Sequence, residues 1–271
     1  SNSQLSTKMD LGLRGKVAFV TGASAGLGFA VAQTLYNEGA HVAICGRDPE
    51  RIKQAALAIG EKVLPVCCDV SQEEDVHRAV NEVVSVYGKL HVLVTNAGGP
   101  PSGFINDFSS KDWQDALDLN LMSTINLCRY AIEPLKAAAE EDGHARILMI
   151  TSISAKQPIP NLYLSNVARA GVQGFAKSLS EELGPWGITV NTLLPGFTKT
   201  ERLDALRHAT EQQTGQSGEA IEANWASANA LKRLGEPEEF AAAAVFLASK
   251  PAAYITGIAL PVDGGRAKGL M

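Results

Sequence analysis

Short apolar runs alternate with longer segments of helical periodicity along most of the chain. The runs are rich in β-branched residues and end near glycine, proline, asparagine or aspartate, which is typical of buried strands. They predict strands at 17–20, 41–45, 63–67, 90–94, 147–150, 188–194 and 259–262. Between them, apolar residues recur at helical spacing, most extensively at about 109–140, 162–183 and 237–248. Strands that alternate with helices form parallel sheets, so the pattern predicts an α/β domain.

A glycine-rich turn joins the first predicted strand to the first predicted helix. The turn contains Gly22, Ser24, Ala25, Gly26, Leu27 and Gly28. Glycines let the backbone turn sharply and approach a ligand, while the new helix points unpaired N–H groups and its positive dipole end at that ligand. This is a phosphate cradle. Any tight strand-to-helix connection also favours glycine, so the surrounding α/β series, more than the turn itself, favours nucleotide binding.

Two polar residues at the ends of the next strands bear on cofactor choice. Dinucleotide folds place an acidic residue after the second strand to hold the ribose hydroxyls, whereas a phosphorylated ribose needs positive charge there. Here Arg47 occupies that place, which favours NADP over NAD, although an arginine at a helix start is also commonly a solvated surface charge. Asp69 follows the third strand and either accepts from the adenine amino group or is a plain turn aspartate.

The later strand ends deliver further candidates to the same edge of the sheet. The fourth strand is followed by small residues that let the backbone approach a flat ring, and the fifth by Ser152. These candidates are Asn96, Ala97, Gly98, Ser152, Pro195, Gly196 and Thr198. Residues 199–235 are polar and irregular, and we expect them to form a lid over this edge. Its apolar underside would consist of Phe197, Leu203, Leu206 and Trp225.

The composition of the chain limits the classes of function that it can have. With 271 residues, 45% of them hydrophobic, the chain suits one domain, which we place at 11–266 after a flexible polar leader at 1–10 that is in part an expression scar. A net charge of -5 gives no basic field for nucleic acid, and no apolar run is long enough for a bilayer. The four cysteines lie in or beside apolar runs without metal-ligand spacing to the histidines, so we expect buried reduced thiols and a cytoplasmic protein.

Together these motifs resemble the short-chain dehydrogenase/reductase family over about 11–265. The cofactor turn at 21–28, the adenine contact Asp69 and Val70, the motif at 96–98, and Asn120, Ser152 and the pair at 195–196 stand at family positions. The resemblance implies a single-domain, Rossmann-like, doubly wound parallel sheet of about seven strands with helices on both faces. It also implies bound NAD(P), a homotetramer or dimer, and hydride transfer between nicotinamide and a carbonyl or alcohol substrate, as in 3-oxoacyl reductases.

The chain departs from the family at its chemical centre. The family's serine and asparagine match Ser152 and Asn120, but the tyrosine and the lysine four residues later are replaced by Ser165 and Arg169. A serine hydroxyl is a far weaker acid than a phenol, and an arginine does not tune a neighbour as lysine does, although it still donates to ribose hydroxyls.

Tyr163 lies two residues before the expected tyrosine position. In a helix its side chain would point about 200° away from position 165, whereas in a loop it would swing into the site, with Lys156 as a distant cation. Otherwise Tyr163 packs or lines the substrate pocket.

These residues support three hypotheses. The first is an NADP-dependent oxidoreductase in which Ser152 orients the substrate oxygen, Arg169 holds the ribose, and Tyr163 or a water on Ser165 moves the proton. The second is an NAD(P)-binding protein without turnover that acts as a sensor or assembly partner. The third is an enzyme that uses the nucleotide structurally and catalyses elimination or isomerisation of an acyl-type substrate.

Overall fold

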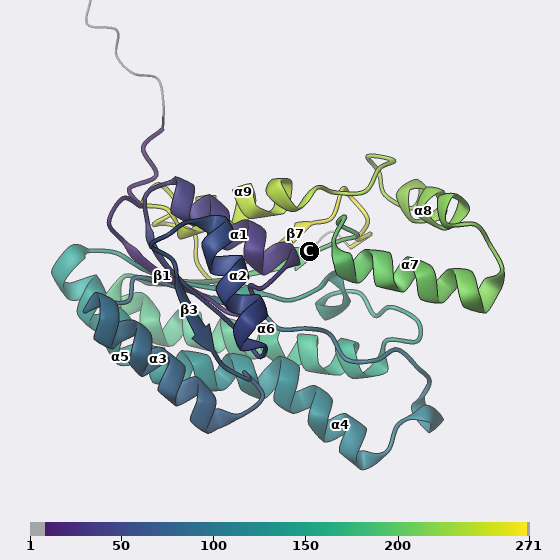
Figure 1. Ribbon diagram of the computed structural model, residues 1–271, viewed down its shortest axis with the longest axis horizontal. Helices are drawn as coiled ribbons and strands as arrows, with labels where there is room; N and C mark the ends of the chain where they lie inside the picture. Colours follow the sequence, from purple (N-terminus) through teal and green to yellow (C-terminus); the bar gives the residue numbers. More distant parts are fainter. Residues whose placement is uncertain (1–8, 270–271) are drawn as a thin grey trace, which may run out of the picture.

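A seven-stranded, entirely parallel sheet forms the centre of the protein (Figure 1). The computed structural model describes residues 9–269, so most of the expected leader at 1–10 lies outside the described residues. The strands are β1 Val17–Val20, β2 His41–Gly46, β3 Leu64–Cys67, β4 Val92–Thr95, β5 Ala145–Ile150, β6 Ile188–Pro195 and β7 Ala259–Val262. Their order in the sheet is β3-β2-β1-β4-β5-β6-β7. The predicted single-domain, doubly wound α/β fold is confirmed.

Helices cover both faces of the sheet. They are α1 Gly26–Asn37, α2 Pro49–Ile59, α3 Glu73–Tyr87, α4 Ser110–Leu117, α5 Ser123–Asp142, α6 Tyr163–Leu183, α7 Glu201–Thr214, α8 Gly218–Ser227 and α9 Pro237–Ala248. One apolar core lies between the sheet and α1, α2 and α9, and a second lies between the sheet and α3, α5 and α6. Because β1, β4 and β5 are covered on both sides, all of their residues are buried, which explains why they are apolar except for Thr95 and Arg146.

The order of the strands fixes where a ligand binds. The chain runs outward from β1 to β2 and β3, then returns to place β4 on the other side of β1. The connections after β1 and β4 therefore leave in opposite directions, and a crevice opens beyond the carboxyl ends of these two strands. The glycine-rich turn and the loop at 96–99 stand at this place.

The expectation of an irregular segment at 199–235 is wrong. This segment forms α7 and α8, which project to one side of the layered core in Figure 1. The Thr200 side chain accepts from the N–H of Leu203, and Ser217 caps α8 in the same way. Leu203 is buried as expected, but Leu206 is 43% exposed and does not belong to an apolar underside. A polar helix has no apolar stripe by which the sequence could reveal it.

Two further expectations are corrected. The long helix expected at about 109–140 is interrupted at Asp118–Met122, where one π-helical turn, η2, separates α4 from α5. Cys45, Cys68 and Cys128 are buried free thiols as predicted, but Cys67 is exposed at the end of β3. An edge strand has one less neighbour to cover its side chains, and β3 is the edge of this sheet.

Candidate active site

The glycine-rich turn is held tightly against the loop that follows β4. Gly22 has a φ of +56°, and a Cβ there would lie 2.7 Å from the carbonyl oxygen of Asn96. The Asn96 Nδ2 donates to the Gly22 carbonyl oxygen at 3.0 Å. Thr21 Oγ1 donates to the Asn96 carbonyl oxygen and accepts from the Asn96 N–H, both at 2.8 Å. Only glycine fits this approach, and the shape of the turn is fixed before any ligand arrives.

The helix that follows the turn begins without a side-chain cap. Ala25 occupies the cap position in extended conformation and makes no side-chain bond to the first turn, which also contains no acidic residue. The first N–H groups of α1 and the positive end of its dipole are therefore left for an anion. Gly28 lies so close to the Gly22 carbonyl oxygen that a Cβ there would be 2.5 Å from it. These residues fit the diphosphate of a dinucleotide.

Arg47 lies where a ribose phosphate would be recognised. It is exposed directly after β2, and Asp48 next to it caps α2 by accepting from the Arg51 N–H at 2.9 Å. A Cβ at Gly46 would lie 3.6 Å from Ser24 Oγ, so the hydroxyl of the glycine-rich turn lies beside the residue that precedes Arg47. A hydroxyl and a guanidinium at the end of β2, with no carboxylate in the acidic position, suit a phosphate better than two ribose hydroxyls.

Asp69 works mainly as a turn residue. Its Oδ1 accepts from the Ser71 N–H at 3.0 Å and from Ser71 Oγ at 2.8 Å, and its own N–H donates to Asp75 Oδ2 at 3.1 Å. The turn is thereby fixed at the end of β3, with the neighbouring Val70 buried. An adenine amino group would have to use the remaining acceptor capacity of the carboxylate.

Asn120 lies in the π-helical turn η2 and is fully buried. Its Nδ2 donates to the Gly98 carbonyl oxygen at 2.6 Å, whereas its Oδ1 has no hydrogen-bond partner among the described residues. A π-turn widens the helix at one point and recurs at functional sites, and here it carries an amide whose acceptor is left free. The expected asparagine is therefore joined to the cofactor loop at 96–99.

Three serines form a row at the end of β5. Ser152 is half-buried and caps the short η3 turn Ile153–Ala155, its Oγ accepting from the Ser154 N–H at 3.1 Å. The hydroxyls of Ser154 and Ser165 are 3.3 Å apart, and Ser165 comes from α6. The structure therefore joins the two serines that the sequence singled out through Ser154, a residue that sequence reasoning missed.

Arg169 is buried one turn further along α6. It is 6% exposed, its Nη1 donates to the Ile150 carbonyl oxygen at 3.3 Å, and its Nε has no partner among the described residues. Burial, and then the nearby charge of Arg202, lower the pKa of Arg169 to about 10. It therefore stays protonated at neutral pH and offers donors at Ile150, the last residue of β5.

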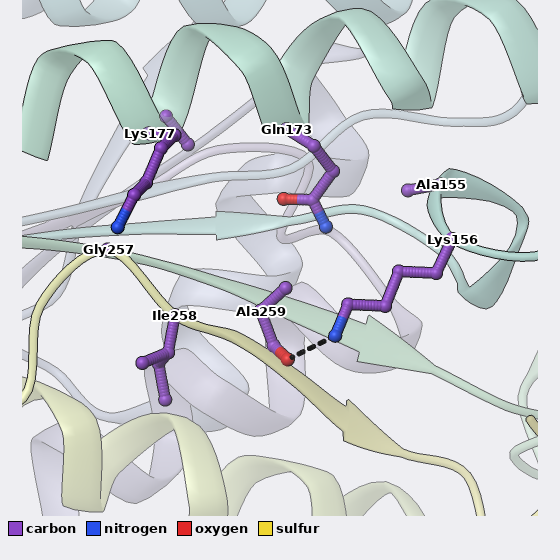
Figure 2. A pocket seen from close by; sticks show the side chains of 8 residues that line it. Ala155, Lys156, Gln173, Lys177, Gly257, Ile258 and Ala259 are labelled. Atoms are coloured by element: carbon purple, nitrogen blue, oxygen red, sulfur yellow. Dashed lines mark hydrogen bonds between the residues drawn. The ribbon is translucent and has the colours of Figure 1, made fainter. Parts of the chain in front are cut away.

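Tyr163 and Lys156 do not rescue the missing Tyr–Lys pair as a unit. Tyr163 is the first residue of α6 and 42% exposed. It therefore lies in a helix and not in a loop, and helical geometry directs its side chain away from that of Ser165. Lys156 extends toward β7, where its Nζ donates to the Ala259 carbonyl oxygen at 3.3 Å (Figure 2). It lines a cavity of about 220 Å³ together with Gln173 and Lys177. Its role as a distant cation for Tyr163 is not supported.

The residues after β6 connect the site to α7. Gly196 lies against the backbone of Asp263, and the Thr198 Oγ1 donates back to the Gly196 carbonyl oxygen at 3.4 Å. Thr198 also pairs with Gly235 through a backbone bridge, which closes the base of the segment at 199–235. The rings of Phe197 and Trp225 pack against each other, with their centroids 4.9 Å apart.

Arg202, in the first turn of α7, is a second cation that sequence reasoning missed. Its guanidinium packs against Gly99 of the loop at 96–99, and its positive charge lowers the pKa of Arg169. A basic residue inside a polar stretch carries no pattern that indicates where its side chain ends. Only the turn from Thr198 through the Thr200 cap brings α7 back to the sheet edge.

Comparisons with known proteins agree with this geometry. A family model described as enoyl-(acyl carrier protein) reductase matches residues 22–267. The 3-oxoacyl-(acyl-carrier-protein) reductase of Chlamydia muridarum is 36% identical over 256 residues, covering 93% of this chain and 97% of the relative. Dehydrogenase/reductase SDR family member 4 of Homo sapiens is 33% identical over 257 residues, covering 93% and 88%. The chain belongs to the short-chain dehydrogenase/reductase family.

Solved structures of this family superpose closely. L-Sorbose reductase from Gluconobacter frateurii, complexed with NADPH and L-sorbose, has a TM-score of 0.91 at 33% identity and covers 97% of this chain and 100% of its own. Actinorhodin polyketide ketoreductase with NADPH has a TM-score of 0.88 at 30% identity, with 94% and 98% covered. The prediction of an NAD(P)-dependent short-chain dehydrogenase/reductase is confirmed at this level. Among residues 9–269, no helix has the length and apolar character to span a bilayer.

Proposed function

We propose that this short-chain dehydrogenase/reductase is an NADPH-dependent carbonyl reductase with a serine-based proton relay. The observation that carries the proposal is the cluster of Ser152, Ser154 and Ser165 at the end of β5, one strand from the loop at 96–99. The Ser152 hydroxyl accepts from the Ser154 N–H, the Ser154 and Ser165 hydroxyls are paired, and the buried Arg169 donates to Ile150 of the same strand. The NADPH bound to L-sorbose reductase supports the choice of cofactor, as does Arg47 at the end of β2. An acyl or sugar ketone matches the substrates for which the bacterial 3-oxoacyl reductase and L-sorbose reductase are named.

Each residue of the candidate site has a separate role in the proposed carbonyl reduction. Bound NADPH supplies the hydride to the carbonyl carbon. Ser152 donates a hydrogen bond to the carbonyl oxygen and so fixes the face that receives the hydride. Arg169 donates to the nicotinamide ribose. The proton reaches the oxygen through a water held by Ser165, whose hydroxyl is linked to Ser154 at 3.3 Å, and Asn120 orders that water with its free Oδ1.

Tyr163 is the other proton donor that the sequence left open. It is an exposed phenol two residues from Ser165, whereas Ser165 is half-buried and already hydrogen-bonded to the serine row. Tyr163→Phe should therefore leave the rate of carbonyl reduction nearly unchanged, and Ser165→Ala should lower it about 10²-fold, the lower range of a positioned acid–base group. The reverse pattern would transfer the role to Tyr163.

The primary experiment is a fluorescence titration with NADPH and NADH, followed by an absorbance screen for carbonyl-dependent oxidation of NADPH across sugars, 3-oxoacyl thioesters and quinones. Arg47→Asp should weaken NADPH binding about 10-fold or more and leave NADH binding nearly unchanged. Arg129→Asp, which reverses an exposed positive charge on α5, is the control. An equal effect of Arg47→Asp on both nucleotides would remove the NADPH preference.

The second candidate, a nucleotide-binding protein without turnover, is favoured by the replacement of both Tyr and Lys by Ser165 and Arg169. It predicts NADPH binding with no carbonyl-dependent oxidation. The double variant Ser165→Tyr with Arg169→Lys restores the family's pair and should then create turnover that the unmodified protein lacks. A homo-oligomer stays a prediction under both candidates, to be measured by light scattering.

A further inference from the structure

Arg202 links the helical segment after β6 to the cofactor loop. It lies in the first turn of α7, and its guanidinium occupies the space beside Gly99 where any other residue would carry a Cβ. Gly99 follows Gly98, whose carbonyl oxygen is held by Asn120. The guanidinium is thereby brought to the sheet edge where the cofactor loop, the π-helical turn and α7 meet.

Two positive charges gather at this place without an acid to balance them. Neither Arg169 nor Arg202 forms a salt bridge with any residue from 9 to 269. The carboxylate next to Arg202 in sequence, Glu201, pairs instead with Arg51 of α2. The carboxylate that precedes Arg202 in the chain is therefore engaged with another arginine.

Burial makes this arrangement costly. Arg169 is 6% exposed with an unpartnered Nε, and its pKa falls to about 10 because of burial and the charge of Arg202. Partial burial of its guanidinium also lowers the pKa of Arg202, although the residue as a whole is exposed. The like charge of Arg202 therefore acts on an arginine that has lost its hydration, and an anion bound by both would relieve the repulsion and supply Arg169 with a partner.

We propose that Arg202 and Arg169 form a receptor for an oxyanion, a carboxylate or phosphate group that is bound while the carbonyl lies at Ser152. This inference rests on the proposed function for the identity of the ligand. The acidic group of an oxo-acid substrate is the favoured source, because Arg169 donates to Ile150, two residues before Ser152, and the uncapped N–H groups of α1 are available for the diphosphate at β1. The NADPH diphosphate is the other source of the same chemistry.

The charge geometry suits such a group. A guanidinium presents planar pairs of N–H donors that match the two oxygens of a carboxylate or phosphate, and it keeps its charge at neutral pH. Arg202 sits on α7, outside the sheet, so the receptor is complete only when the base of α7 is held at the edge by Thr198 and Gly235.

The test uses calorimetric titration of the full chain with pyrophosphate and, in the presence of NADP⁺, with acetoacetate and its methyl ester. Arg202→Met should weaken at least one of the two anions about 10–100-fold, as expected for a lost charged hydrogen bond, and Arg202→Lys should lose less because it keeps the charge without the fork. Arg14→Met, which removes an exposed arginine before β1, is the matched control.

The two sources separate in the same experiment. A preference for acetoacetate over its methyl ester that disappears in Arg202→Met, with NADPH binding unchanged, assigns the receptor to the substrate. Weaker binding of NADPH and pyrophosphate by Arg202→Met assigns it to the cofactor. The inference would be overturned if a folded Arg202→Met protein bound pyrophosphate and acetoacetate as tightly as the unmodified protein does. It would also be overturned if the unmodified protein bound neither measurably. Because these are binding measurements, a failure of carbonyl reduction leaves their outcome readable.

Discussion

Two buried arginines stand at opposite ends of strand β5, and their surroundings differ. Arg146 lies at its start, 1% exposed, with Nε donating to the Ser249 carbonyl oxygen at 3.3 Å and Nη1 donating to that of Ala145 at 2.9 Å. Arg169 lies beyond its end, equally buried, with one bond to Ile150 and an Nε that has no partner among the described residues. Burial lowers the pKa of both.

The difference separates structure from function. At the start of β5 the carbonyls at the carboxyl end of α9 accept from Arg146 and from His144, where the negative end of the helix dipole also favours a cation. At the other end Arg169 has the Ile150 carbonyl oxygen as its one hydrogen-bond acceptor among residues 9–269, and the positive charge of Arg202 lowers its pKa further. A buried charge with its partners in place holds a fold together, whereas one that lacks them indicates where a ligand completes the set.

The largest expected effect concerns Arg146. Arg146→Met removes the side-chain donors to the carbonyl oxygens of Ser249 and Ala145 at the buried junction of β5 and α9, and each lost bond costs about 1–3 kcal/mol. We expect the free energy of unfolding, measured by urea denaturation, to fall by about 3 kcal/mol, while NADPH affinity of the folded protein is unchanged. A loss below about 0.5 kcal/mol would mean that the two arginines do not differ as described.

The reverse is expected of Arg169. Arg169→Met removes a buried, poorly partnered charge, so the free energy of unfolding without ligand should change by less than about 1 kcal/mol or rise. NADPH affinity, measured by fluorescence titration, should fall about 10-fold because a charged donor to the cofactor is lost. Arg169→Lys, which supplies the family's own residue, is the control and should retain most of the affinity. Destabilisation as large as that of Arg146→Met would contradict the comparison.

A smaller effect should appear with pH at the amino ends of the strands. Burial, reinforced by the charge of Arg146, lowers the pKa of His144 to about 4. Between its ordinary pKa near 6.5 and this value, the unfolded chain binds a proton that the native protein does not, so stability falls as the pH drops. We expect roughly 1 kcal/mol of loss from this group between pH 7 and pH 5, after solvent screening.

His144→Gln tests this pH effect, since its amide can still donate to the Ala248 carbonyl oxygen that His144 Nε2 contacts at 3.0 Å. Urea denaturation at both pH values should show a shallower pH dependence in the variant. An unchanged dependence would assign the acid sensitivity to other groups, such as His91, whose pKa burial also lowers.

The sequence predicted the sheet well because its central strands are covered on both faces. Burial on two sides favours nearly unbroken apolar runs there, and each of the seven predicted runs overlaps an observed strand. The cradle at 22–28 was predictable for a related reason, since the close approach of Gly22 to Asn96 leaves room for no side chain. Both signals arise from contacts that exclude whole classes of residue.

The missed features lack such a signal. The polar helices α7 and α8 bury few residues, so their start depends on the Thr200 and Ser217 caps and not on an apolar stripe. The π-turn at Asn120 is a change in hydrogen bonding within a continuous helical pattern. The position of the Arg202 guanidinium beside Gly99 depends on how a long side chain crosses from one element to another, and local patterns do not encode that distance.

The loop from Asn96 to Gly99 is fastened at both ends. Asn96 is tied to Thr21 and Gly22 at the phosphate cradle, and Gly98 is tied to Asn120 next to the reaction centre. We expect a shift of this loop at the cradle to be transmitted along it to the amide of Asn120. Nucleotide binding would then also adjust the position of the residue that faces the reaction.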